Sequence, residues 1–206
     1  MRKGILAITL IFLLVGCKDT DDEIGYMATP VDLEIPQLFE DNILPPVIPE
    51  DNPLTEEGIA LGQKLFFDPI LSANNTQACA DCHRAPNAFT DPRQFSVGID
   101  GSVGTRNSMP LFNLAWNYGE KFFWDGRANS LEEQILDPVT NPIEMANTWP
   151  NAVSALESDA MYPQLFEEAF GVTTIDSTLV TKAIAQFLRT LVSSNSKFDR
   201  YLLGEN

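Results

Sequence analysis

The chain is poor in histidine, cysteine and positive charge. Its 206 residues contain one histidine and three cysteines, and 13 Lys and Arg stand against 29 Asp and Glu, for a net charge of −16. Such an excess of acid argues against nucleic acid as a partner and against direct adhesion to anionic lipid. The sequence also lacks internal repeats and stretches of strand periodicity, which favours a mainly helical protein.

Two of the three cysteines lie in a five-residue motif, Cys79-Ala80-Asp81-Cys82-His83. A Cys-x-x-Cys pair followed directly by histidine is the attachment signature of a c-type haem. The two thiols add to the vinyl groups of the porphyrin, and the histidine becomes the proximal ligand of the iron. A redox Cys-x-x-Cys pair does not need the histidine, and a zinc site needs two further ligands that this chain cannot supply. The motif therefore predicts one covalent haem c.

The remaining cysteine, Cys17, follows Arg2-Lys3 and an apolar run that is too short to span a bilayer. Leu14 to Cys17 resemble the bacterial lipobox, which implies a signal peptide over 1–16 and acylation of Cys17. An ordinary secretory signal is the alternative. The acidic stretch 18–23 and the proline-rich segment that follows predict a tether over 17–51. We therefore expect a lipid-anchored protein of the bacterial cell envelope, periplasmic or on the outer-membrane surface.

The rest of the chain, 52–206, predicts one haem domain of cytochrome c-like, mainly α fold with long loops wrapped around the haem. The turn-rich stretch 84–119 is long for a compact domain and is typical of a loop that serves a site. Caps and apolar periodicity predict the helices. One helix is expected from Thr55 to Asp68-Pro69 and a second from Ser130 to Asp137-Pro138. A third is expected to begin at Pro150, and a fourth to end at Gly171. The last is expected from about Asp176 to Val192.

The single histidine limits the chemistry on the other side of the haem. Cleavage of peroxide needs a group that takes a proton from one oxygen and returns it to the other. With His83 used by the motif, that group has to be a carboxylate. An electron carrier instead needs a sixth iron ligand, for which Met109, Met145 and Met161 are the methionine candidates. The residues alone leave both alternatives open.

Ordered blocks over about 150 residues resemble the N-terminal half of the bacterial dihaem cytochrome c peroxidase family, which includes the MauG-like enzymes. In that half the family binds its peroxidatic haem. The blocks are 61–69, the haem motif, 89–91, 106–110, 123–128, 131–134, 141–145, 187–191 and 196–202.

The resemblance implies haem c-dependent reduction of hydrogen peroxide to water, with electrons from a cytochrome or copper protein. It implies that Glu144 is the proton shuttle and that Gln134 positions peroxide. Trp124 matches a tryptophan that lies between two haems and is thought to carry electrons. Without the resemblance, Gln134 is a polar helix residue, Glu144 a capping residue and Trp124 a buried aromatic. A monohaem electron carrier and MauG-like oxidation of a protein substrate remain the alternatives.

Three further residues are candidate ligands. Asn107 matches a calcium ligand of the family, and the alternative is a turn residue. Arg106 and Arg127 are candidates to pair with haem propionates, and salt bridges within the loops are equally expected.

The sequence departs from the family pattern in two places. Many members carry a ligating histidine after a Ser-x-Gly step, where this chain has Ile99 after Ser96-Val97-Gly98. Isoleucine cannot bind iron, so we expect a sixth position without a protein ligand. Family members also continue into a second haem domain, which this sequence does not contain. A fragment, a truncated gene and a separate subunit are the alternatives.

Overall fold

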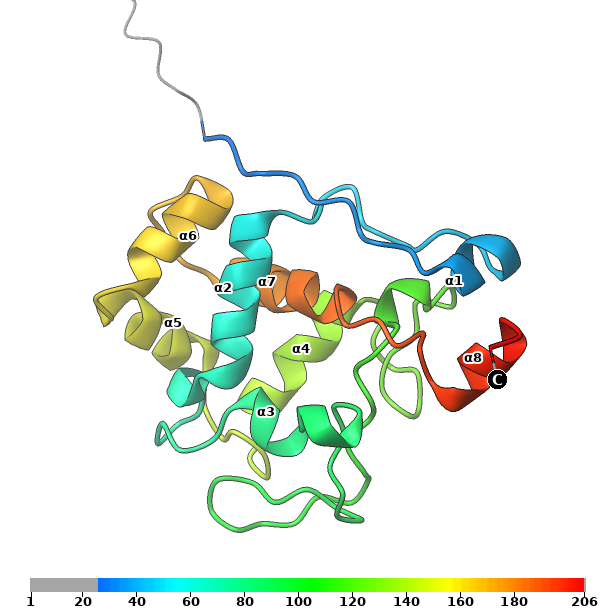
Figure 1. The fold of residues 1–206 in the computed structure, drawn as a ribbon. Helices are drawn as coiled ribbons and strands as arrows, with labels where there is room; N and C mark the ends of the chain where they lie inside the picture. The colour runs from blue at the N-terminus through cyan, green and yellow to red at the C-terminus, as the bar shows by residue number, and fades with distance from the viewer. Residues whose placement is uncertain (1–25, 206) are drawn as a thin grey trace, which may run out of the picture.

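In the computed structural model, residues 26–205 are described, and they fold around two central helices, α2 and α7 (Figure 1). Short 3₁₀ turns at 69–71, 85–87 and 114–116 connect some of the elements. The helices are α1 (Gln37–Asn42), α2 (Glu56–Phe67), α3 (Cys79–Cys82), α4 (Leu131–Thr140), α5 (Trp149–Ser158), α6 (Tyr162–Phe170), α7 (Ser177–Arg189) and α8 (Lys197–Leu202).

Helices α2 and α7 approach each other closely because glycine stands at their crossing. A Cβ atom on Gly62 would lie 1.9 Å from the carbonyl oxygen of Ala183, so the two backbones touch there. Leu65 and Phe66 of α2 and Ile184 of α7 are almost fully buried around this contact. The core of the protein therefore lies between α2 and α7, and α4 packs against α7 beside it.

A buried polar network ties α2, α4 and α7 together. Arg189 donates to both carboxylate oxygens of Glu132, at 2.7 and 3.1 Å. Asn52 donates to Glu132 at 2.7 Å and accepts from the amide of Gln186 at 2.9 Å. The Gln186 oxygen accepts in turn from the backbone N–H of Thr55 at 3.0 Å. Because each of these contacts joins different elements, the network fixes how the three helices are placed.

Several helix ends lie at the predicted capping residues. Thr55 accepts from the N–H of Gly58, and Ser130 accepts from the N–H of Glu133. Pro150 lies in the first turn of α5. Gly171 ends α6 with φ +67°, a conformation that glycine adopts without strain. Local capping chemistry was therefore sufficient to place these boundaries.

Two helix predictions need correction, and two short helices were missed. Asp137-Pro138 does not close α4, which continues to Thr140, because a proline in the last turn removes only one hydrogen bond. Helix α7 ends at Arg189 rather than at Val192. Helices α1 and α8 were not predicted, since each is six residues long and exposed and shows little apolar periodicity.

The segment before α2 lies along the domain (Figure 1). Its backbone bonds to the domain at several points, from Val31 to Leu54 at 2.9 Å and from Val47 to Ala115 at 2.6 Å. The division into a tether over 17–51 and a domain over 52–206 stays a prediction. The predicted signal peptide and Cys17 lie outside the described residues.

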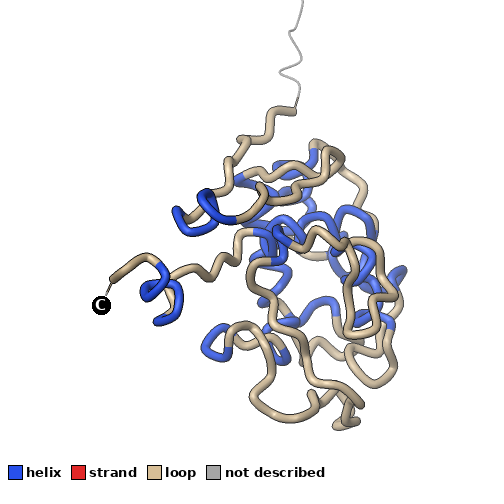
Figure 2. Tube along the Cα trace, turned by 90° about the vertical axis from the view of Figure 1, so that its right-hand side faces the viewer, coloured by secondary structure: helices blue, strands red, loops and turns tan. Residues whose placement is uncertain are grey.

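Most of residues 84–130 are loop, drawn in tan in Figure 2. Only isolated bridges pair within it, such as Val97 with Val103 and Phe122 with Ala128. Residues 26–205 contain no strand longer than such a bridge, which confirms the mainly α fold. Across the same residues, every helix is too short or too polar to cross a membrane.

Candidate haem site and peroxide pocket

A cavity of about 360 Å³ lies between the helices and the 84–130 loops. Its size is within the usual range of ligand pockets. It contains every predicted site residue that lies in the described part of the chain. Its walls include Cys79, Cys82, His83, Arg106, Asn107, Trp124, Arg127, Gln134 and Glu144.

The haem motif forms one wall of this cavity. Cys79 and Cys82 are the ends of the single turn of α3, and Asp81 fixes the start of that turn by accepting from the N–H of Ala78 at 2.8 Å. Both thiols are free. Burial raises the pKa of Cys79 to about 12, so this thiol is held neutral in an apolar environment.

His83 is oriented by the backbone of the turn that follows it. Its Nδ1 lies 2.9 Å from the carbonyl oxygen of Phe89, which assigns the proton to Nδ1 and leaves the lone pair on Nε2. Ala88 and Phe89 both adopt left-handed backbone angles, with φ 58° and 54°. Such angles are uncommon outside glycine and bring the Phe89 carbonyl back toward the imidazole. Burial lowers the pKa of His83, which favours the neutral, ligating form.

These features fit a covalently bound haem. Two free thiols at Cys-x-x-Cys spacing and the imidazole of His83 line a largely apolar cavity. One wall also carries a buried amide, Gln77, whose Nε2 donates to Cys82 Sγ at 3.3 Å and to the Val97 carbonyl at 3.2 Å. The Gln77 oxygen has no hydrogen-bond partner within the described residues, as expected where a further group is to be bound.

The predicted acid–base residues come from α4 and the turn after it. Gln134 is 8% exposed and lies one turn into α4, and Pro138 follows on the same face of the helix. Glu144 lies in the next turn, where its Oε1 accepts from Asn141 at 2.6 Å. Burial, and then the charge of Asp137, raise the pKa of Glu144 above its usual value. A carboxyl with a raised pKa at a cavity wall is a candidate acid–base group.

Trp124 is placed differently from the buried aromatic expected on sequence alone. Its side chain is 61% exposed, at the rim of the cavity. Its Nε1 donates to the carbonyl of Asn107 at 2.9 Å. The preceding Phe123 adopts a left-handed backbone angle, φ 66°, which turns the chain at this point. The indole is thus held in a fixed place while one face remains open to a partner.

The two arginines at the rim form salt bridges with loop and helix aspartates. Arg106 contacts Asp125 at 2.9 Å. Arg127 contacts Asp125 at 3.1 Å and Asp137 at 2.6 Å, and its guanidinium lies 3.4 Å from the ring centre of Phe123. The salt-bridge alternative therefore describes this structure, and pairing with haem propionates stays a prediction.

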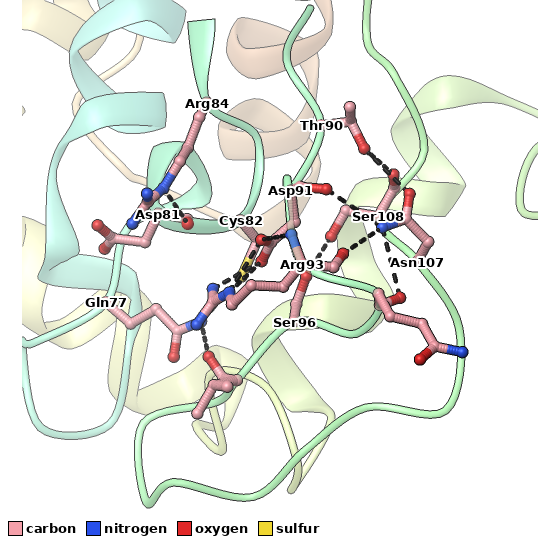
Figure 3. A network of polar contacts seen from close by, with 12 residues as sticks. Gln77, Asp81, Cys82, Arg84, Thr90, Asp91, Arg93, Ser96, Asn107 and Ser108 are labelled. Atoms are coloured by element: carbon pink, nitrogen blue, oxygen red, sulfur yellow. Dashed lines mark hydrogen bonds and ion pairs between the residues drawn. The ribbon is translucent and has the colours of Figure 1, made fainter. Parts of the chain in front are cut away.

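Asn107 holds its own loop together. Its Nδ2 donates to the carbonyls of Asp91 and Arg93, at 3.2 and 2.7 Å, and its Oδ1 accepts from Thr90 (Figure 3). Among residues 26–205 no cluster of three or more His, Cys, Asp or Glu side chains is arranged to hold a metal ion. These contacts agree with the turn alternative, and the calcium ion stays a prediction.

Sequence reasoning missed the ion pair of Asp91 and Arg93, which Figure 3 shows beside the haem motif. The side chain of Asp91 is fully buried, and the contact with Arg93 is 2.6 Å. Hydrogen bonding to Arg93 lowers the pKa of Asp91 to about 2. Asp91-Pro92 had indicated only a turn. The position of Arg93, two residues after Asp91, was the only sequence feature that could have indicated this ion pair.

The loop with Ile99 packs against the Glu144 turn. Ile99 donates to the carbonyl of Glu144 at 3.0 Å, and a Cβ on Gly98 would lie 2.1 Å from the carbonyl of Ile143. The sixth position without a protein ligand stays a prediction. Of the candidate methionine ligands, Met109 and Met145 line the cavity, whereas Met161 is half-exposed at the start of α6.

Comparison with known proteins identifies the family of this chain. Residues 56–206 match the family model of di-haem cytochrome c peroxidases. The chain belongs to this family. Membership confirms the resemblance seen in the sequence and implies a c-type haem, which the cavity, the thiols and His83 fit.

The relatives include both branches of the family. The chain is 44% identical over 158 residues to the methylamine utilization protein MauG of Methylorubrum extorquens, covering 76% of this chain and 44% of that protein. It is 38% identical over 159 residues to the cytochrome c peroxidase Ccp of Escherichia coli, covering 77% and 34%. It therefore spans less than half the length of these two relatives.

A solved structure supports the fold. A MauG-like protein associated with microbial copper homeostasis superposes with a TM-score of 0.76 at 34% identity, covering 85% of this chain and 51% of that one. The cytochrome c-like helical domain with long loops is thus the fold of a known relative.

Proposed function

We propose that this chain is a peroxidatic haem domain that reduces hydrogen peroxide to water. Each peroxide takes up two electrons and two protons and yields two waters, and the electrons come from a cytochrome or a copper protein. The observation that carries the proposal is Glu144, a half-buried carboxyl at the cavity wall of a chain whose single histidine belongs to the haem motif.

The residues that line the cavity divide the work. A haem bound through Cys79, Cys82 and His83 would supply the iron at which peroxide coordinates and electrons arrive. Glu144, at the wall of the same cavity, takes the proton from one peroxide oxygen and returns it to the other. Gln134 orients peroxide through its amide. Leu111, Ile135 and Val139 line the same cavity and limit access of bulk water.

Trp124 is the proposed entry point for electrons. Its exposed indole at the rim lies where a partner domain or donor protein can contact it. The same position suits a second candidate function, MauG-like oxidation of a protein substrate, which the 44% identity to a MauG favours. One experiment distinguishes peroxide reduction from oxidation of a protein substrate. The electron donor is replaced by a candidate protein substrate, and peroxide-dependent oxidation of that substrate is measured.

A monohaem electron carrier would instead bind cyanide slowly, because a sixth ligand has to leave the iron first.

The proposal is tested by Glu144→Gln in the haem-loaded protein. We expect the rate of reaction with peroxide to fall by about 10²- to 10⁴-fold, the usual contribution of a positioned acid–base group. Glu167→Gln is the matched control, because Glu167 is exposed on α6 and does not line the cavity. An unchanged rate for Glu144→Gln would exclude this mechanism.

We also propose attachment to the cell envelope through lipid on Cys17. The support is the lipobox-like sequence together with a c-type haem, whose attachment motif is found in exported proteins. The change Cys17→Ser should move the protein from the membrane fraction to the soluble fraction after cell lysis, and an unchanged distribution would contradict the anchor.

A further inference from the structure

Asn141 is at the centre of the turn that carries Glu144. It is the C-cap residue of α4, and its N–H donates to the carbonyl of Asp137 at 2.9 Å. Its own carbonyl accepts from the N–H groups of Glu144 and Ala146, both at 3.0 Å. Its side-chain Oδ1 accepts from the N–H of Ile143 at 3.2 Å, and its Nδ2 donates to Glu144 Oε1 at 2.6 Å.

The orientation of this amide is fixed by its two partners. Reversing it would turn the NH₂ group toward the Ile143 N–H, a donor against a donor, and the oxygen toward a carboxylate. Both contacts would be repulsive. Asn141 therefore presents a donor, and only a donor, to Glu144.

The geometry points to Asn141 as the positioning residue that reserves one oxygen of Glu144 for the moving proton. This inference rests on the proposed function, in which Glu144 exchanges a proton with peroxide. The oxygen that accepts from the amide, Oε1, stays an acceptor, so Oε2 is left to take up and release the proton. Asn141 thereby sets which atom of the carboxyl does the work.

Asn141 also stabilises the ionised form of Glu144 against its surroundings. Burial and the negative charge of Asp137 on α4 raise the pKa of Glu144, and the Asn141 bond and the charge of Arg127 oppose that rise. Cys79 and Cys82 on α3 line the same cavity as this carboxyl. Arg127 is itself paired with Asp137, whereas the Nδ2 of Asn141 donates directly to Glu144.

The test compares Asn141→Asp with Asn141→Ala in the ferric haem-loaded protein. The protonation of Glu144 is followed by infrared titration of its carboxyl band, which Glu144→Gln identifies. The aspartate keeps the acceptor for the Ile143 N–H but places a carboxylate oxygen beside Glu144. We expect the Glu144 titration to move to higher pH by about one pH unit in Asn141→Ala and by more in Asn141→Asp.

A purely structural role for Asn141 predicts the reverse order, because the aspartate preserves the turn and alanine does not. An Asn141→Asp protein in which Glu144 titrates as in the wild type would overturn the inference. Asn151→Ala, on the exposed side of α5, is the matched control and should leave the titration unchanged.

The pH dependence of peroxide reduction gives a second readout. Glu144 must be ionised to accept the first proton, so the acidic limb of the profile should move to higher pH with the infrared titration. The two proposals can fail separately. An unchanged peroxide rate in Glu144→Gln would reject the proposed function, whereas an unchanged Glu144 titration in Asn141→Asp would reject the role of Asn141.

Discussion

The helical half of the molecule, α2, α4 and α7, and the loop half, residues 84–128, meet at the same cavity but are held by different interactions. The helices satisfy their own backbone groups and are joined by apolar packing and one buried polar network. The loops have few backbone pairs, and side chains such as those of Asn107 and Asp91 bind their carbonyl and N–H groups instead.

Because of this difference, the helical half determines the stability of the whole domain, and the loop half determines where the site residues lie. Apolar burial is proportional to area and contributes to the stability of the whole domain. Side chain to backbone bonds in a loop each hold only a few residues. Changes in the helical half should therefore lower global stability, and changes in the loop half should loosen the haem side locally.

The largest expected effect is at the crossing of α2 and α7. Gly62→Ala places a methyl group 1.9 Å from a backbone oxygen of Ala183, which cannot move aside as a side chain can. We expect the free energy of unfolding to fall by about 4 kcal/mol or more, beyond the usual cost of overpacking. Chemical denaturation measures it, and Gly119→Ala, whose Cβ would meet its nearest neighbour only at 3.7 Å, should be near neutral.

Removing one member of the buried ion pair comes next. Arg189→Met leaves the largely buried Glu132 without its charged partner, so that, among residues 26–205, only the Asn52 amide still donates to it. This change should lower the free energy of unfolding by about 3 kcal/mol. In the double variant Glu132→Leu with Arg189→Met no buried charge remains, so most of the loss should be recovered. If both variants were equally unstable, packing rather than charge would explain the effect.

The same pair predicts an acid dependence of stability. Burial opposes ionisation of Glu132, but hydrogen bonding and the charge of Arg189 outweigh it, and the pKa of Glu132 is lowered. A lowered pKa in the folded state stabilises the protein above the pKa of the unfolded chain, about 4.3, and this stabilisation is lost as pH falls through the folded value. Arg189→Met should lack this acid-dependent loss in urea melts recorded at decreasing pH.

In the loop half, Asp91→Asn should have a smaller and local effect. The pKa of Asp91 is about 2 because of Arg93, so its contribution is complete above about pH 4 and is lost between there and pH 2. We expect amide hydrogen exchange to speed up within residues 84–108, while α2 and α7 remain protected. Faster exchange in those helices would show that the two halves are not separate units.

The smallest expected effect on stability is at Trp124. Because the side chain is 61% exposed, Trp124→Phe should change the melting temperature by less than about 2 °C. Peroxide turnover with a protein electron donor should nevertheless slow down. Equal turnover in both proteins would remove Trp124 from the proposed electron route.

The sequence was most informative where structure is local. Thr55, Ser130 and Gly171 marked helix ends through contacts within a few residues. It was less informative at Pro138, because a proline in the last turn of a helix removes only one hydrogen bond and need not end the helix. It missed the burial of Asp91, since an aspartate before proline looks the same in an exposed turn.

By itself, the sequence determined the haem motif and the helical class, and it predicted that an acid–base group for peroxide cleavage would have to be a carboxylate, because His83 is the single histidine. Covalent chemistry and helix periodicity are encoded by spacing along the chain. Only the tertiary structure brought Glu144 and Gln134 to the cavity that His83 also lines. The bond from Asn141 to Glu144 is local, three residues along the chain, but the burial that raises the pKa of Glu144 arises only when distant segments pack together.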